Sequence, residues 1–225
     1  MKITITKNGP YVVDAGIPLK EVDSVADQEG RGVLTYQERA DHGKADTNTY
    51  LCRCGHSQNK PFCDGHHAKL GFDGTETNDK KPYDAKAEHI RGAIYDALDN
   101  QALCAAARIC DVGTGFLNAL ESTHEADKQY TEHVGCNCPS GRFTLLDKQT
   151  HQKLEPKLDP EIQLITDIPA EHLGPIYVKG GIQVTGADGF EYETRNRVTL
   201  CRCGESNNRP FCDGTHLDCK HMELK

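Results

Sequence analysis

The chain has 225 residues, of which 36% are hydrophobic and none is tryptophan, and its formal net charge is −8. This composition disfavours a single large core and favours several small domains that are held by more than packing. Acidic and basic residues are mixed without a basic stripe, so we expect no nucleic-acid partner. The sequence has no apolar stretch of about 18 residues, so we expect no membrane-spanning segment.

The cysteine content is high, at 11 residues. The beginning of the sequence alternates in polarity and does not resemble a secretory signal, so we expect a reducing compartment, the cytoplasm. Thiols in such a compartment favour metal binding over disulfide formation. An odd number of cysteines also does not suit a closed framework of disulfide bonds.

The first predicted strand, residues 11–13, follows a turn at Gly9-Pro10. A polar connection over residues 14–49 comes next, and we interpret it as a loop inserted into a small sheet. The segment 82–150 differs from the segment before it in its pattern of apolar residues. Its residues Ile90, Ile94 and Leu98 recur every four positions, which predicts one amphipathic helix over residues 87–98.

After a linker with several prolines, the pattern of the first segment returns. The turn at Gly174-Pro175 precedes a predicted strand over residues 176–178. An Asp188-Gly189 turn then lies between two short alternating runs, as in a β-hairpin. We therefore expect three domains, residues 1–81, 82–150 and 151–225, with the middle one rich in helix.

Two cysteine motifs repeat each other. Residues 52–67 read CRCGHSQNKPFCDGHH and residues 201–216 read CRCGESNNRPFCDGTH, with twelve of sixteen positions identical. Each copy has Cys-x-Cys, a third cysteine nine residues on, and a histidine four residues after that. The candidate ligands are Cys52, Cys54, Cys63 and His67 in the first copy, and Cys201, Cys203, Cys212 and His216 in the second.

The spacing of these residues suggests two ligand-bearing arms. In an extended segment, residues i and i+2 point the same way, so Cys52 and Cys54 can face one metal atom. The four-residue spacing of Cys63 and His67 places both on one face of a helical turn, which we expect residues 61–64 to begin. Two ligands from each arm suit a two-iron cluster. A structural zinc ion with Cys3His ligation is the alternative.

Other residues near the ligands carry weaker expectations. Arg53 and Arg202, each between two ligating cysteines, either offset the charge of a cluster or are solvated. Ser57 and Ser206 are expected to donate hydrogen bonds to sulfur or to the backbone. Cys219 is expected to be an exposed free thiol.

Both motifs resemble the signature of the CDGSH iron-sulfur domain, the mitoNEET-like family, which reads C-x-C-x2-(S/T)-x3-P-x-C-D-G-(S/A/T)-H. The second copy follows it at Cys201, Cys203, Ser206, Pro210, Cys212, Asp213, Gly214, Thr215 and His216. The first copy departs only at His66, where the family has a small residue, and the spacing favours His67 over His66 as the ligand. The resemblance implies one [2Fe–2S] cluster per copy. It also implies an α+β fold in which two small β-rich domains pair as an intramolecular pseudo-dimer.

The middle segment contains four more cysteines. Cys104 and Cys110 are separated by five residues, and Cys138 precedes a proline. This pattern is similar to a single-cluster, ferredoxin-like domain in which Ala107 replaces one ligand. The resemblance implies a [3Fe–4S] cluster held by Cys104, Cys110 and Cys138, unless Cys136 completes a [4Fe–4S] cluster.

These features predict an electron-transfer protein and not an enzyme, because no residue set suggests a nucleophile or a substrate pocket. We expect a monomer with an internal pseudo-two-fold axis and a redox partner protein. Storage or donation of iron-sulfur clusters is one alternative function. A zinc-stabilised binding module is the other.

Overall fold

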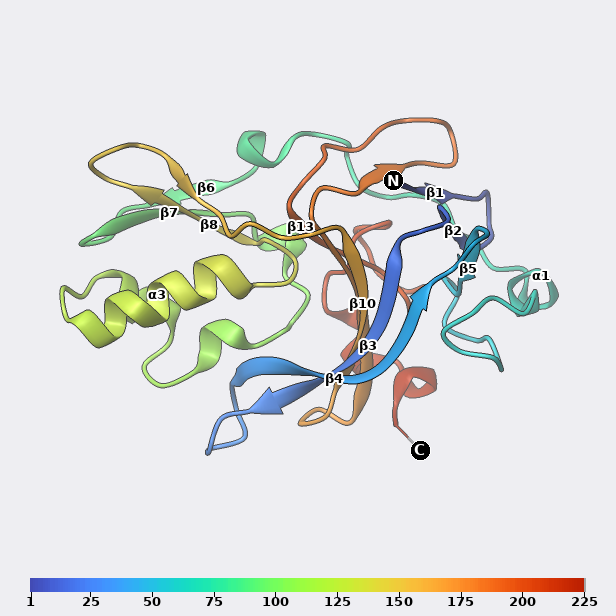
Figure 1. Ribbon diagram of the computed structural model, residues 1–225, viewed down its shortest axis with the longest axis horizontal. Coiled ribbons are helices and arrows are strands. Elements are labelled where there is room, and N and C mark those ends of the chain that lie inside the picture. Colours follow the sequence, from blue (N-terminus) through green and yellow to red (C-terminus); the bar gives the residue numbers. More distant parts are fainter. Residues whose placement is uncertain (225) are drawn as a thin grey trace.

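The computed structural model describes residues 1–224, which form three β-sheets and a few short helices. At one end lie α3 (Glu125–Asn137), β6 (Glu88–Ile90), β7 (Tyr95–Asp99) and β8 (Phe143–Asp147) (Figure 1). The short helix α1 (His66–Leu70) lies at the opposite end. Two sheets built from the beginning and the end of the sequence occupy the space between them.

The first of these sheets has the strand order β12-β1-β2-β5, and the second has the order β13-β11-β10-β3-β4. The bounds are β1 Lys2–Ile5, β2 Tyr11–Val13, β3 Pro18–Ala26, β4 Val33–Lys44, β5 Thr49–Leu51, β10 Glu161–Asp167, β11 His172–Lys179, β12 Gln183–Thr185 and β13 Arg197–Leu200. The predicted strands over residues 11–13 and 176–178 are thus confirmed. The predicted hairpin is also present, with Gly189 N donating to Gly186 O at 2.9 Å.

Each half of the chain contributes one strand or more to the sheet of the other half. In one sheet β12 runs parallel to β1, with Val184 opposite Ile3. In the other sheet β3 runs parallel to β10, with Leu19 opposite Ile162. These four side chains are all buried in one apolar cluster that both sheets share. The two halves therefore form a common core, and removal of either half would expose the apolar face of the other.

The prediction of an inserted loop over residues 14–49 is wrong. Strands β3 and β4 form a long antiparallel hairpin instead. The segment looks like a loop because β4 lies at the edge of its sheet with most of its side chains in solvent. Charged residues such as Glu38 and Arg39 are common on edge strands, where they prevent pairing with another chain.

The predicted helix over residues 87–98 is also wrong, since this stretch contains β6, a turn and β7. The middle segment is mixed in structure: β6, β7 and β8 form a sheet with β9 (Lys153–Leu154), and α2 (Phe116–Leu120) and α3 complete it. Gly92 lies in the turn, where a Cβ would come within 2.3 Å of Tyr95 O and 2.6 Å of Leu120 O. Close backbone contact at Gly92 and strand pairing on both sides of β7 outweigh the four-residue periodicity.

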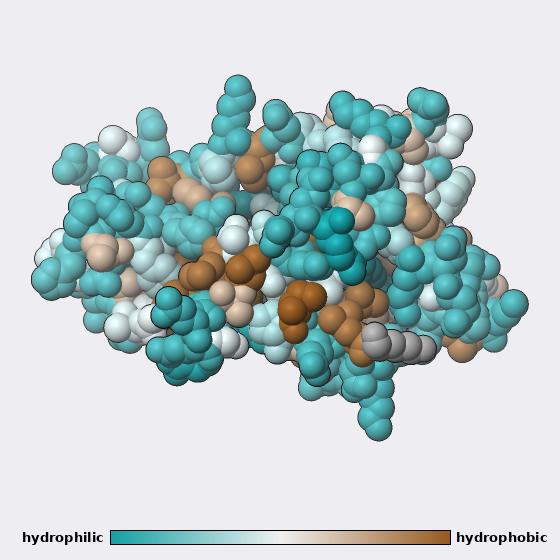
Figure 2. Space-filling model, turned by 60° about the horizontal axis from the view of Figure 1, so that its bottom comes forward, coloured by the Kyte–Doolittle hydropathy of each residue, from teal (hydrophilic) through white to brown (hydrophobic). Residues whose placement is uncertain are grey.

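The surface is mostly hydrophilic on the face of Figure 2, and apolar side chains gather towards its centre. Among the described residues the large exposed apolar side chains are Met1, Leu34, Tyr50, Leu70, Leu117 and Ile168. None of the helices within residues 1–224 has the length and apolar character needed to cross a bilayer.

Candidate metal centres

The first cysteine motif begins where β5 ends. Cys52 N donates to Pro61 O, and Cys63 N donates to Tyr50 O, both at 2.8 Å. These two bonds hold the Cys-x-Cys arm and the Cys-x3-His arm side by side. The second motif repeats both bonds after β13, from Cys201 N to Pro210 O and from Cys212 N to Thr199 O.

The ligand side chains form two contacting pairs in each copy. Cys52 Sγ lies 3.8 Å from Cys54 Sγ, as the i, i+2 spacing predicts. Cys63 Sγ lies 3.4 Å from His67 Nδ1. In the second copy the Cys201–Cys203 sulfurs are 3.6 Å apart and the Cys212–His216 pair is 3.4 Å apart. Two donors in contact on each of two arms can bind two neighbouring metal atoms, one to an arm.

The contact between sulfurs makes one thiol of each pair more acidic. The Cys54 thiol donates to Cys52 and lowers the pKa of Cys52 to about 6 despite partial burial. The same contact with Cys203 lowers the pKa of Cys201 to about 7. Each Cys-x-Cys arm therefore supplies a thiolate near neutral pH, and the thiolate is the form that binds metal.

The loop before the histidine is ordered by an aspartate and not by a helical turn. The prediction that residues 61–64 begin a turn of helix is wrong, because α1 starts at His66. The Asp64 carboxylate accepts hydrogen bonds from Gln58 N at 2.8 Å and from His66 N at 3.0 Å. These backbone bonds lower the pKa of Asp64. Asp213 has the same role in the second copy.

The motif serines bond to the backbone, which is one of the two predicted outcomes. Ser57 Oγ donates to Phe62 O at 2.6 Å and accepts from Asn59 N at 3.0 Å. Ser206 Oγ donates to Phe211 O at 2.7 Å. Both serines are buried and fix the shape of the loop between the two arms.

The motif arginines are not solvated. Arg53 is 2% exposed and Arg202 is 5% exposed. Arg53 Nε donates to Gly9 O at 2.8 Å, and Arg202 Nε donates to the equivalent Gly174 O at 3.0 Å. Burial lowers the pKa of Arg202 to about 10, and the Cys52 thiolate of the other copy acts in the opposite direction. A buried cation within reach of both cysteine loops fits the predicted role of offsetting negative charge.

The two cysteine loops pack back to back. A Cβ at Gly55 would lie 2.7 Å from Cys203 O, and a Cβ at Gly204 would lie 3.0 Å from Cys54 O. Both glycines have positive φ angles, of 79° and 86°. Only glycine therefore allows this reciprocal approach of two backbones.

The two sites differ in their contact with solvent. His216 is 3% exposed and Cys212 is 2% exposed, whereas Cys63 and His67 are only partly buried. Burial lowers the pKa of His216 to about 4, and the nearby Arg202 contributes to the shift. Burial also raises the pKa of Cys212 well above its usual value. The second imidazole is thus neutral at physiological pH, as a metal ligand must be.

Three cysteines of the middle segment line one cavity. Cys104, Cys110 and Cys138 surround a space of about 230 Å³ together with Ser140 and Arg142. Burial raises the pKa of Cys110 to about 12, and Cys138 and Cys104 contribute to the shift. The loop between the first two cysteines is tightly curved, because Ala106 and Arg108 both have positive φ angles.

Two cysteines lie where the sequence pattern does not place them. Cys136 does not line the cavity of the other three, and the charges around it belong to Arg197, Glu155 and Glu132. The prediction that Cys219 is an exposed thiol is wrong, since it is 7% exposed. It packs with Cys201, Cys203 and Met222, and burial raises its pKa. Its burial depends on the C-terminal residues folding back, which no local pattern predicts.

Comparison with known families supports the assignment of both motifs. Residues 8–68 and 173–217 match the family model described as the iron-binding zinc finger of CDGSH type. The chain therefore carries two CDGSH-type iron-binding domains on either side of a middle segment. No curated protein matches the chain.

The donor set at both CDGSH-type sites fits a [2Fe–2S] cluster. Three thiols and one imidazole are present in each copy, and one thiol of each Cys-x-Cys pair is acidified by its neighbour. Within residues 1–224, no group of three or more Cys, His, Asp or Glu side chains is drawn together as for a single metal ion. The observed arrangement is two pairs of donors per site, and a two-iron cluster has two such positions.

Proposed function

We propose that the chain is a one-electron carrier with two [2Fe–2S] clusters and a third iron-sulfur cluster in its middle segment. The first cluster is held by Cys52, Cys54, Cys63 and His67, and the second by Cys201, Cys203, Cys212 and His216. The observation that carries the proposal is the pair of contacting donors on each arm, present in both copies at nearly equal distances.

Iron-sulfur clusters accept and release single electrons, and their potentials depend on ligand charge and burial. The neutral imidazole in place of a fourth thiolate makes each site less negative and raises its potential. The chain contributes two buried cations, Arg53 and Arg202, to the same effect. Electron transfer needs no substrate pocket, so we propose a carrier and not an enzyme. Its partner is a redox protein.

The two CDGSH-type domains form an intramolecular pseudo-dimer in this proposal. Support comes from the strand exchange, in which β12 joins β1 and β3 joins β10, and from the reciprocal contacts of Gly55 and Gly204. The chain is then complete as a monomer. The domains are residues 1–81, 82–150 and 151–225, although β9 of the last segment pairs with β8 of the middle one.

For the middle segment we propose a [3Fe–4S] cluster held by Cys104, Cys110 and Cys138. These three thiols line the same cavity. Cys136 does not line it and lies instead near the charges of Arg197 and Glu155. A [4Fe–4S] cluster would need a fourth ligand in the cavity that is not one of the four cysteines.

Iron and acid-labile sulfide analysis of the anaerobically purified chain tests the proposal, together with electron paramagnetic resonance (EPR) of the oxidised and reduced protein. We expect iron and sulfide for two [2Fe–2S] clusters and one [3Fe–4S] cluster. The oxidised protein should give a [3Fe–4S] signal that is lost in Cys138→Ser and kept in Cys136→Ser. Colourless protein with stoichiometric zinc would contradict the proposal and support a zinc-stabilised binding module instead.

Cluster storage or donation is a second candidate, and the partial exposure of Cys63 and His67 favours it. A cluster with accessible ligands can be transferred to another protein. The two functions are separated by comparing the rate of cluster transfer to an apo-acceptor with the rate of electron exchange. We expect electron exchange to be the faster process.

A further inference from the structure

Equivalent positions of the two CDGSH-type sites have different surroundings. Gly65 and Gly214 precede the ligating histidines by two residues, and both have positive φ angles. A Cβ at Gly65 would meet no heavy atom of residues 1–224 within 4 Å, apart from its own neighbours in the chain. A Cβ at Gly214 would lie 3.2 Å from Ala106 Cβ and 3.5 Å from Cys104 O. The middle segment therefore covers the second site and leaves the first one open.

The segment that covers the second site, residues 105–107, is shared by two candidate sites. Residues 105–107 line the cavity that holds the Cys104, Cys110 and Cys138 thiols. The same three residues also line a second, smaller cavity together with His216. Three alanines are thus shared by the third site and by the imidazole of the second site.

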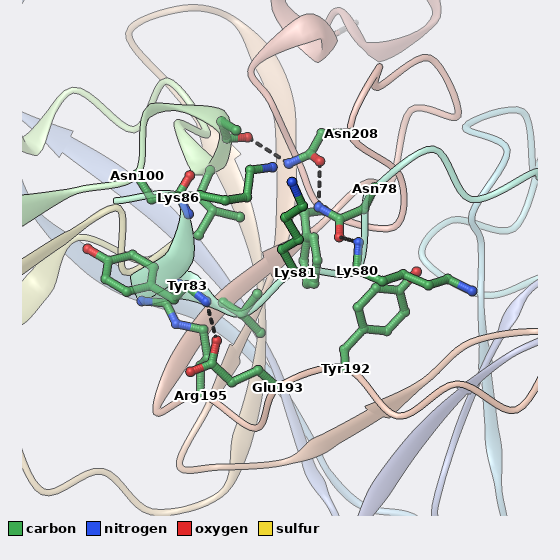
Figure 3. A pocket seen from close by; sticks show the side chains of 14 residues that line it. Asn78, Lys80, Lys81, Tyr83, Lys86, Asn100, Tyr192, Glu193, Arg195 and Asn208 are labelled. Carbon is green, nitrogen blue, oxygen red and sulfur yellow. Dashed lines mark hydrogen bonds between the residues drawn. The ribbon is translucent and has the colours of Figure 1, made fainter. Parts of the chain in front are cut away.

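Hydrogen bonds hold the third site against the second CDGSH-type domain on both sides of its cavity. Asn208 Nδ2 donates to Ala102 O at 2.7 Å, two residues before Cys104 (Figure 3). Arg197 Nη1 donates to Cys138 O at 2.9 Å, and this arginine is 1% exposed. The second CDGSH-type domain therefore bonds one candidate ligand of the third site, Cys138, directly, and it bonds the chain two residues before another, Cys104.

The first site lies away from the middle segment. Helix α1 contains His67 of the first site and occupies the end of the molecule opposite to α3 (Figure 1). The first-half residues that meet the middle segment include those of the β3–β4 hairpin, where Val33 N donates to Arg108 O at 3.1 Å, and Asp79, which pairs with Lys86 at 3.2 Å. They are not part of the first cysteine motif.

We infer that the third site exchanges electrons directly with the second CDGSH-type site through the wall of residues 105–107, and that the first site is the one that meets the outside partner. The inference rests on the proposed function. Electron tunnelling through protein weakens steeply with distance, so a shared wall favours this pair of sites over any other involving the third site. The exchange moves one electron and no atom: the third site is oxidised as the second site is reduced, and the reverse transfer restores both.

Spin relaxation in the intact chain tests this order of sites. His67→Cys and His216→Cys each shift the EPR signal of one [2Fe–2S] cluster and so assign the two signals. Cys110→Ser then removes one thiolate from the third site. We expect the second-site signal to relax faster in the wild-type chain than in Cys110→Ser, and the first-site signal to be unchanged. A change confined to the first-site signal, or no change in either signal, would overturn the inference.

A second measurement needs no variant of the third site. Pulsed dipolar spectroscopy of the wild-type chain compares the coupling of the third site with each [2Fe–2S] cluster, and we expect the stronger coupling with the second. Equal couplings, or a stronger one with the first site, would also overturn the inference. If either measurement contradicts the inference but the chain contains the iron and sulfide expected for all three clusters, the proposed function still stands. An iron-free middle segment would instead overturn the proposed third cluster and the inference with it.

Discussion

The Tyr11 hydroxyl donates a hydrogen bond to Cys201 O at 2.8 Å, although the two residues are 190 positions apart in the sequence. Tyr11 belongs to β2 of the first half, and Cys201 begins the second cysteine motif. The tyrosine is 1% exposed. The equivalent residue of the second half is Ile176, which has no hydroxyl group to offer. The first half thus donates a hydrogen bond to the second site, and the equivalent residue of the second half, Ile176, cannot donate one to the first site.

Replacing Tyr11 by phenylalanine should affect the second site selectively. We expect the free energy of unfolding to fall by about 1 kcal/mol, because a buried carbonyl loses one donor. The EPR signal of the proposed [2Fe–2S] cluster at the second site should shift, and the signal from the first site should not. Tyr50→Phe is the control, since Tyr50 is 52% exposed. An unchanged second-site signal in Tyr11→Phe would contradict this role.

Replacing Arg202 by lysine should destabilise the chain. Arg202 donates to Gly174 O at 3.0 Å and to Ile165 O at 2.9 Å, and an ammonium group cannot reproduce this forked geometry. We expect a loss of about 2 kcal/mol in the free energy of unfolding, measured by denaturant titration. Arg31→Lys is a matched control because its side chain is 70% exposed, and it should cause almost no loss. Equal effects in the two variants would argue against a structural role of Arg202.

The contact between the two cysteine loops predicts a cost of substitution at Gly55. Gly55→Ala should lower the free energy of unfolding by more than Gly16→Ala, although the two glycines have the same φ of 79°. Left-handed strain of about 1–2 kcal/mol applies to both variants. Only Gly55 also meets a backbone oxygen at 2.7 Å, whereas no atom among the described residues lies within 4 Å of a Cβ at Gly16. Thermal unfolding with the clusters bound measures the difference, and similar losses in both variants would refute it.

Local features of the sequence predicted local features of the structure. The i, i+2 spacing of Cys52 and Cys54 was enough to place their sulfurs in contact. The Asp188-Gly189 turn and the strand after Gly174-Pro175 also follow from short-range steric preferences. These predictions succeeded because each depends on a few neighbouring residues.

Features that depend on distant residues were not predictable in this way. The parallel pairing of β3 with β10 joins residues more than a hundred positions apart, and no local signal specifies it. The helix predicted over residues 87–98 failed because β7 pairs on one side with β8, a strand more than 40 residues further along the chain, and on the other side with β6 inside the same window. The burial of Cys219 and of Arg53 likewise depends on segments that pack over them. Tertiary contact outweighed local propensity at each of these places.

The two CDGSH-type sites should respond differently to acid. An imidazole must be neutral to bind iron, so protonation competes with ligation. Burial lowers the pKa of His216 to about 4, whereas the partly exposed His67 is open to solvent. We expect iron to leave the first site at a higher pH than the second as the pH is lowered from about 8 to about 4. Visible absorbance and EPR at each pH measure the two losses.

The sign of the effect on folding follows from the same pKa. An unfolded histidine binds a proton near pH 6.5, and buried His216 does so only at about 4, so acid favours the unfolded chain between these values. The free energy of unfolding is therefore unaffected by His216 above pH 6.5, and protonation of this histidine in the unfolded chain lowers it by up to about 3 kcal/mol as the pH falls towards 4. His67→Cys should remove the first step of iron loss and leave the second, and His216→Cys should do the reverse. Loss of both clusters in one step at the same pH in the wild-type chain would contradict the difference in burial as its cause.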